Sequence, residues 1–160
     1  MAEKEKLAIV VFSGDLDRAL TAFILATTGA SMGMEVSMFF TFWGLNIIKK
    51  NSGGIKSKGL IRKMLNFVNR GGSHRLKLSR FNMFGLGTWM MNRLMKETKT
   101  PSVDEFITMA HQMGVKLYAC STSCGVMGIP DDAFRDEVED FAGATFFLGE
   151  AREAKVSFFI

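Results

Sequence analysis

The sequence predicts an α/β fold with three layers, α/β/α, built on a mostly parallel five-stranded sheet. Residues 7–12 form an uninterrupted apolar run that is closed by Ser13-Gly14-Asp15, which is typical of a strand buried on both faces. A helical pattern and a second strand follow this run. The same alternation of helix and strand returns after Pro101. Alternation of this kind is typical of right-handed parallel crossover units.

The first unit covers residues 7–42. Apolar residues recur from Leu16 to Thr27 at the spacing of one helix face, so we expect a helix that packs on the sheet. The stretch from Gly29 to Gly33 is expected to break that helix, and residues 35–42 predict the second strand.

The second unit begins at Ser102. Ser102 and Glu105 form a capping-box pattern, which predicts a helix over residues 103–113 that ends at Gly114. The remaining elements expected in order are a strand at 115–120, a helix at 131–141, a strand at 143–147, a short helix at 150–154 and a strand at 156–160.

The middle of the chain, from 46 to 100, is too long for a bare connection between two strands. Apolar periodicity predicts one helix at 60–68 and another around 90–95, and the glycine-containing stretch 71–88 is expected to be an exposed or partner-covered loop. We therefore expect a single domain over residues 1–160 with a basic, mainly helical insertion at about 46–100.

Composition supports a globular protein, because 48% of the 160 residues are hydrophobic and 22% are charged. The chain has two cysteines and a charged start, Met1–Lys6, with no signal-peptide profile. These features argue against a disulfide-stapled secreted domain and favour a cytoplasmic, reducing location.

Charge is distributed unevenly. Residues 36–96 hold twelve Lys or Arg and no Asp or Glu, whereas the rest of the chain holds the other eight basic residues and all sixteen acidic ones. Such a basic middle on an acidic frame predicts either self-association or an anionic partner.

Two uncharged stretches, 19–34 and 36–48, are each too short and too interrupted by polar residues for a transmembrane helix. We expect no membrane span, while peripheral contact with a membrane surface stays open. No nucleic-acid partner is expected.

Candidate chemistry lies where the predicted strands end, because ligands of open parallel sheets gather beyond the carboxyl ends of the strands. Cys120 is the last residue of its strand and is followed by small polar residues whose free amides, with the next helix start, would favour a thiolate. The candidate catalytic residues are Cys120 and Cys124. The candidate pocket residues are Ser13, Gly14, Thr41, Trp43, Gly44, Ser121, Ser123 and Gly125.

Other interpretations of these residues stay open. A free cysteine at a strand end is often a packing residue, and Cys124 is either a resolving thiol or a small turn residue. The Cys-x3-Cys spacing differs from the Cys-x2-Cys of zinc and thioredoxin-type sites, so we expect no metal and no cofactor. His74 and His111 are expected to be surface residues.

Several strings in this order resemble the DsrE-like sulfurtransferase family, in its longer single-chain subgroup. They are Met38-Phe39-Phe40-Thr41-Phe42-Trp43-Gly44-Leu45, Lys77-Leu78-Ser79, Asn82-Met83-Phe84-Gly85, residues 89–95, Gly114-Val115-Lys116-Leu117-Tyr118-Ala119-Cys120, Met127-Gly128-Ile129, and the ending from Gly143 to Ile160.

The resemblance implies a sulfur-relay protein that carries sulfane sulfur on a cysteine as a persulfide-type adduct. The family's cysteine falls on Cys120, while relatives usually have a non-cysteine residue at the place of Cys124. The implied partner is a TusA-type or rhodanese-type sulfur carrier protein, and the resemblance also implies a homo-oligomer.

Two other classes of function remain as alternatives. One is a non-catalytic small-molecule or nucleotide-binding module that uses the same crevice. The other is an oligomeric or anion-binding adaptor that acts through the basic residues 49–80.

Overall fold

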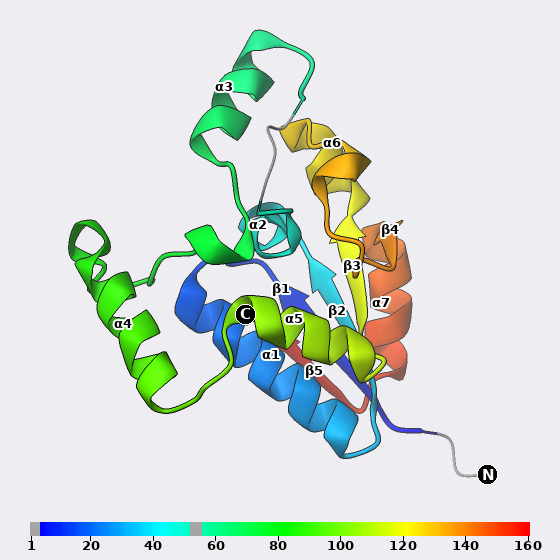
Figure 1. Ribbon diagram of the computed structural model, residues 1–160. Coiled ribbons are helices and arrows are strands. Elements are labelled where there is room, and N and C mark those ends of the chain that lie inside the picture. The colour runs from blue at the N-terminus through cyan, green and yellow to red at the C-terminus, as the bar shows by residue number, and fades with distance from the viewer. Residues whose placement is uncertain (1–3, 52–55) are drawn as a thin grey trace.

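The sheet at the centre of the protein has five strands in the order β4-β3-β2-β1-β5, and every neighbouring pair is parallel (Figure 1). The computed structural model describes residues 4–51 and 56–160. The first three residues of the charged start, and residues 52–55 of the basic segment, lie outside the described residues. The strands are β1 (Lys6–Val11), β2 (Glu35–Phe40), β3 (Lys116–Cys120), β4 (Asp140–Ala142) and β5 (Val156–Phe159). The predicted α/β fold with a five-stranded parallel sheet is confirmed.

Helices cover both faces of the sheet. The path β1-β2-β3 moves in one direction, so right-handed crossovers place α1 (Leu16–Ser31) and α5 (Val103–Gln112) side by side on one face. The chain reverses direction between β4 and β5, which places α7 (Ala144–Glu153) on the other face (Figure 1). The core accordingly has two clusters, a large one beneath α1 and α5 and a small one beneath α7.

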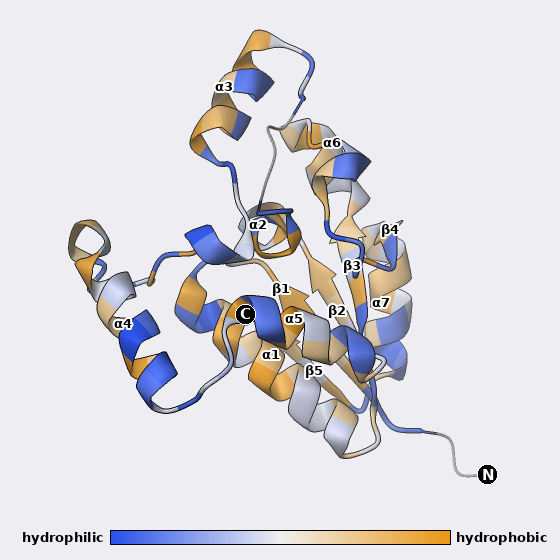
Figure 2. Cartoon of the chain, in the orientation of Figure 1, coloured by the Kyte–Doolittle hydropathy of each residue, from blue (hydrophilic) through white to orange (hydrophobic). Residues whose placement is uncertain are grey.

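The described residues between β2 and α5 form the helices α2 (Leu45–Ile48), α3 (Leu60–Val68) and α4 (Leu86–Glu97), with 3-10 turns at Phe42–Gly44, Ser73–Arg75 and Met83–Gly85. The helix predicted at 60–68 is confirmed, and the one predicted around 90–95 lies within the longer helix α4. Figure 2 shows hydrophobic residues on α3 and α4, which stand away from the sheet. Helix α3 buries the polar Asn66 and exposes Ile61, Met64 and Phe67.

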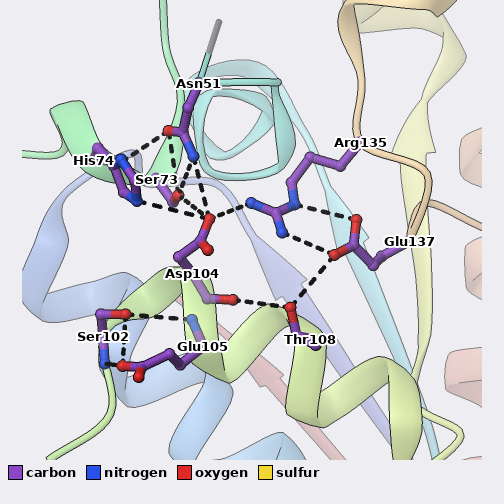
Figure 3. Close-up of polar contacts among 9 residues, drawn as sticks. All are labelled: Asn51, Ser73, His74, Ser102, Asp104, Glu105, Thr108, Arg135 and Glu137. Atoms are coloured by element: carbon purple, nitrogen blue, oxygen red, sulfur yellow. Dashed lines mark hydrogen bonds and ion pairs between the residues drawn. The ribbon is translucent and has the colours of Figure 1, made fainter.

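A polar network ties this segment to the body of the domain (Figure 3). The Asp104 carboxylate on α5 accepts hydrogen bonds from Ser73, Asn51 and the Arg135 guanidinium. Burial raises the pKa of Asp104, but the hydrogen bonds from Arg135 and Ser73 outweigh it and the net pKa is lowered. Arg135 also pairs with Glu137 at 2.8 Å. The Asp104 carboxylate therefore stays ionised, and it holds both the segment that contains Asn51 and Ser73 and the one that contains Arg135.

Two predicted elements are wrong near the carboxyl end of the chain. The helix expected at 131–141 is a single 3-10 turn, Asp131–Ala133, followed by an irregular segment with a turn at residues 136–137 that leads into β4. Contacts with the rest of the domain hold this segment in a non-helical path, because the Arg135 N–H donates to the Ile48 carbonyl and the Glu139 N–H donates to the Leu117 carbonyl.

The strand expected at 143–147 is wrong, because these residues begin helix α7. The helix expected at 150–154 is present as the last turn of α7, which ends at Glu153. The apolar residues at 144–147 are compatible with a strand or a helix. Packing favours the helix, since Phe147 stacks on Phe39 of β2 with ring centroids 5.0 Å apart.

Helix α1 ends at Ser31, within the predicted stretch from Gly29 to Gly33. A Cβ at position 29 would lie 2.6 Å from a Leu7 methyl, so this glycine lets α1 approach the sheet closely. The turn after the helix uses Gly33, whose φ is +84°.

Within residues 4–51 and 56–160, no helix combines the length and the apolar character that crossing a membrane requires.

Candidate functional site

Cys120 is the last residue of β3, and α6 (Ser121–Met127) begins at the next residue. Successive side chains of a strand point to opposite faces, so Cys120 lies with Tyr118 and Phe39 in the small cluster beneath α7. The cysteine is only 6% exposed, whereas Ser121 and Thr122 directly after it are exposed. The thiol therefore lies just beneath the surface at the carboxyl end of the sheet.

Two hydroxyl groups from different elements converge on the sulfur. Ser123 Oγ donates to Cys120 Sγ at 3.4 Å, and Thr41 Oγ1 lies 2.8 Å from Ser123 Oγ. Thr41 follows β2 and Ser123 lies in α6, so the neighbouring strands β2 and β3 bring the two hydroxyls together. The structure thus joins three of the predicted site residues: Cys120, Thr41 and Ser123.

These contacts set the acidity of the thiol. Burial raises the pKa of Cys120, but hydrogen bonds from Ser123, from Thr41 and from the Thr122 N–H stabilise the thiolate. The net pKa lies below the ordinary value for cysteine. A lowered pKa increases the fraction of reactive thiolate at neutral pH.

Cys124 has the opposite environment. It is 5% exposed and belongs to the large cluster beneath α1 and α5, on the other side of the sheet from Cys120. Burial, reinforced by the negative charge of a Cys120 thiolate, raises the pKa of Cys124 to about 12. The two cysteines are both free thiols in this structure.

Lys49 is a buried charge that the sequence patterns do not distinguish from the other basic residues of the middle segment. Its side chain is 1% exposed, and its ammonium donates to Asn46 Oδ1 at 2.8 Å and to the Asn69 carbonyl at 3.3 Å. Burial lowers the pKa of Lys49 to about 8, and the nearby Cys124 acts in the opposite direction. Its only sequence signal is its place directly after the buried apolar residues of α2.

Ser13, Gly14 and Trp43 line a cavity of about 350 Å³ at the carboxyl end of β1, together with Asn46. Gly14 and Gly44 let the turns after β1 and β2 touch. A Cβ on Gly14 would lie 2.6 Å from the Trp43 carbonyl oxygen, and one on Gly44 would lie 2.0 Å from the Val11 carbonyl oxygen. Both glycines therefore have a steric role in shaping this edge of the sheet.

The other candidate residues lie around the site without contact to the sulfur. Ser121 Oγ donates to the Ala142 carbonyl at 3.3 Å, and Gly125 is exposed on α6. His74 and His111 are exposed, as predicted. Within the described part of the chain, no three His, Cys, Asp or Glu side chains group together as a metal site would require.

Comparison with known proteins connects this geometry to one family. The sequence profile of the DsrE/DsrF/DrsH-like family matches residues 3–159. The chain is 34% identical to the sulfur carrier protein DsrE2 of Allochromatium vinosum, over 99% of each chain. It is also 34% identical to the uncharacterized protein YrkE of Bacillus subtilis, over 99% of this chain and 98% of that one.

Solved structures share the fold at low sequence identity. The YchN protein of E. coli superposes with a TM-score of 0.57 at 9% identity, over 98% of this chain and 99% of that chain. MTH1491 of Methanobacterium thermoautotrophicum, a protein of unknown function, gives a TM-score of 0.58 at 9% identity, over 97% and 99%. With a profile match over nearly its whole length and relatives of 34% identity, the chain belongs to the DsrE/DsrF/DrsH-like family.

Proposed function

We propose that this protein is a cytoplasmic sulfur-relay protein that carries sulfane sulfur on Cys120 and passes it to a partner thiol. Its similarity to a sulfur carrier of the same family supports the sulfur-relay role. The observation that carries the proposal is the thiol at the end of β3, which two hydroxyl groups from neighbouring elements bias toward the thiolate. A reducing compartment keeps this thiol available.

In the loading step, the Cys120 thiolate attacks the outer sulfur of a sulfane donor such as thiosulfate. One sulfur–sulfur bond forms on Cys120 while the donor's sulfur–sulfur bond breaks, and sulfite leaves with the electron pair. The product is the Cys120 persulfide anion, and the step needs no external oxidant. Ser123 Oγ donates to the Cys120 sulfur at 3.4 Å, and Thr41 Oγ1 lies 2.8 Å from Ser123 Oγ.

In the unloading step, the thiolate of a partner attacks the outer sulfur of the persulfide. The bond to Cys120 breaks, and Cys120 leaves as a thiolate that is ready for another cycle. A leaving thiol with a lowered pKa departs faster, so the same hydrogen bonds assist both steps. A TusA-type or rhodanese-type carrier is the expected acceptor.

Cys124 is assigned no nucleophilic role in this proposal. A thiol with a pKa of about 12 is almost wholly protonated at neutral pH, and protonated thiols are poor nucleophiles. Its position on the other side of the sheet favours a packing role.

The test is intact-mass spectrometry of the reduced protein before and after treatment with thiosulfate or polysulfide. We expect adducts of about 32 Da, one sulfur atom, on wild type and on Cys124→Ser, and none on Cys120→Ser. Adding a reduced acceptor carrier should then remove the adduct and transfer the same mass to the acceptor.

Cys124→Ser is the matched control, because it removes the other thiol, four residues along the chain in α6. Equal labelling of wild type and Cys120→Ser would contradict the proposal. Absence of any adduct would instead favour a non-catalytic binding module. A loss of about 2 Da that needs both cysteines would indicate a dithiol switch in place of a one-cysteine carrier.

A further inference from the structure

A second feature of the chain lies away from the Cys120 sulfur. A cavity of about 590 Å³ opens at the carboxyl end of β1, and its wall includes Asp15, Asn46, Asn69, Arg70, Arg75 and Lys77. We call it the Asn69 cavity. Carboxyl ends of parallel strands are where open α/β sheets bind small ligands.

The charge of the wall is predominantly positive. None of Arg70, Arg75 and Lys77 forms an ion pair with a carboxylate among the described residues. The wall has one carboxylate, that of Asp15. It accepts a hydrogen bond from Ser13 Oγ at 2.8 Å and lies 3.9 Å from the Arg18 guanidinium. Three cations with no internal counterion favour an anionic occupant.

A chain of hydrogen bonds ends at this wall on an unused donor. The Lys49 ammonium can only donate, so the atom of the Asn46 side-chain amide that faces it must be the oxygen, Oδ1. The Asn46 amide nitrogen must then donate to Asn69 Oδ1, at 2.6 Å. This leaves Asn69 Nδ2 as a buried donor without an acceptor among the described residues. A buried donor of this kind is unfavourable unless a ligand or water accepts from it.

The loop that carries the cations is fixed to the domain at several points. The Gly72 N–H donates to the Asn46 carbonyl at 2.7 Å, and the Lys77 carbonyl accepts from Leu16 at the start of α1 at 2.8 Å. Gly71 has a φ of +70°, and a Cβ there would lie 2.6 Å from Lys49 Cδ. Because only glycine fits at this point, the loop can close over Lys49 and hold its shape beside α2.

We propose that the Asn69 cavity binds a tetrahedral oxyanion of charge −2, either free, as in thiosulfate or sulfate, or carried as a phosphate on a larger molecule. The Asn69 amide donates to an oxyanion oxygen, and Arg75 and Lys77 neutralise its charge. This site is separate from the sulfur-relay chemistry, because none of its contacts involves the Cys120 thiol.

The test is isothermal titration calorimetry at constant ionic strength with four probes: thiosulfate, sulfate, inorganic phosphate and AMP. The Cys120→Ser variant is used throughout, so that no sulfur transfer contributes heat and the result does not depend on the proposed relay. We expect saturable binding of at least one probe. The sulfur oxyanions, free phosphate and the phosphomonoester distinguish the sources of the ligand.

Asn69→Asp is the sharpest variant. The substitution keeps the oxygen that accepts from Asn46 and replaces the unused donor with a negatively charged oxygen, so we expect oxyanion binding to be lost. Arg75→Gln and Lys77→Gln should each weaken binding about tenfold, the loss expected for one charge-assisted hydrogen bond.

Arg93→Gln is the matched control, since it removes one charge from the same basic segment but on α4, where Arg93 pairs with Glu97 at 3.1 Å. Its affinity should equal that of the parent. Circular dichroism and thermal unfolding without ligand check that each variant is folded. Failure of all four probes to bind the parent, or equal affinity in Asn69→Asp and Arg93→Gln, would overturn the proposal.

Discussion

The two cysteines differ in acidity because their side chains lie in different clusters, on opposite faces of the sheet. Cys120 accepts hydrogen bonds that stabilise its thiolate, so its pKa is lowered despite burial. Cys124 lies in the large apolar cluster, where burial raises its pKa to about 12. Spacing alone assigns both cysteines the same candidate role; the environment of each separates them.

Ser123→Ala tests this difference at the residue scale. Removing the hydroxyl that donates to Cys120 Sγ should raise the pKa of Cys120 and slow its alkylation by iodoacetamide at pH 7 about two- to tenfold. The measurement is the alkylation rate against pH in a Cys124→Ser background, where Cys120 is the only thiol. Ser121→Ala is the control, because that hydroxyl donates to the Ala142 carbonyl instead. If the pH profile of alkylation is identical with and without Ser123→Ala in the Cys124→Ser background, the Ser123 hydroxyl does not set the pKa of Cys120.

Local sequence patterns predict an element well where residues of the element itself form the hydrogen bonds that cap it. Ser102 and Glu105 form the predicted capping box, in which the Glu105 N–H donates to Ser102 Oγ at 3.3 Å and the Ser102 N–H donates to the Glu105 carboxylate at 2.7 Å. The 131–141 segment has no such local cap. The backbone N–H groups of Arg135 and Glu139 donate to carbonyls on other elements, α2 and β3. Its apolar periodicity therefore predicts a helix that the packed domain does not form.

Ser102→Ala should lower the free energy of unfolding by about 1 kcal/mol, because the first turn of α5 loses its side-chain acceptor. Urea unfolding followed by circular dichroism measures this loss. Glu105→Gln keeps a side-chain oxygen that can accept the Ser102 N–H, and its loss should be smaller. The reverse order of the two variants would contradict the capping assignment.

At the scale of the whole molecule, α3 presents an apolar surface to solvent. This helix turns Asn66 inward, where its amide donates to Ser57 Oγ at 2.7 Å and to the Met127 carbonyl at 2.9 Å. Ile61 and Phe67 stay 78% and 69% exposed. A helix that buries a polar residue and exposes apolar ones is typical of an interaction surface. The basic, mainly helical segment at about 46–100 thus fits the predicted role in assembly.

We predict that the protein forms a homo-oligomer that uses the exposed face of α3. Sedimentation velocity should give a mass above the 17.8 kDa of one chain. The double substitution Ile61→Ser with Phe67→Ser should shift the protein toward the monomer by removing apolar area from the contact. Lys63→Ser, an exposed change on the same helix, should leave the distribution unchanged. A wild-type monomer at all concentrations tested would contradict this prediction.

The sequence by itself determined the features that depend on neighbours along the chain. The buried apolar run of β1, the periodicity of α1, the capping box of α5 and the position of Cys120 at a strand end are all local patterns. The strand-helix-strand order then restricts the fold, because parallel crossovers have one hand. The α/β architecture and the place of the candidate thiol followed from these patterns.

Only the tertiary structure decided what depends on residues far apart in the sequence. The non-helical path before β4, the helical state of residues 144–147 and the contact between Thr41 and Ser123 each arise from elements that the sheet brings together. The Lys49-Asn46-Asn69 chain is the clearest case, because nothing local separates Lys49 from the other basic residues of its segment. Burial and partner geometry set the chemistry of these groups, and both come from packing across the whole domain.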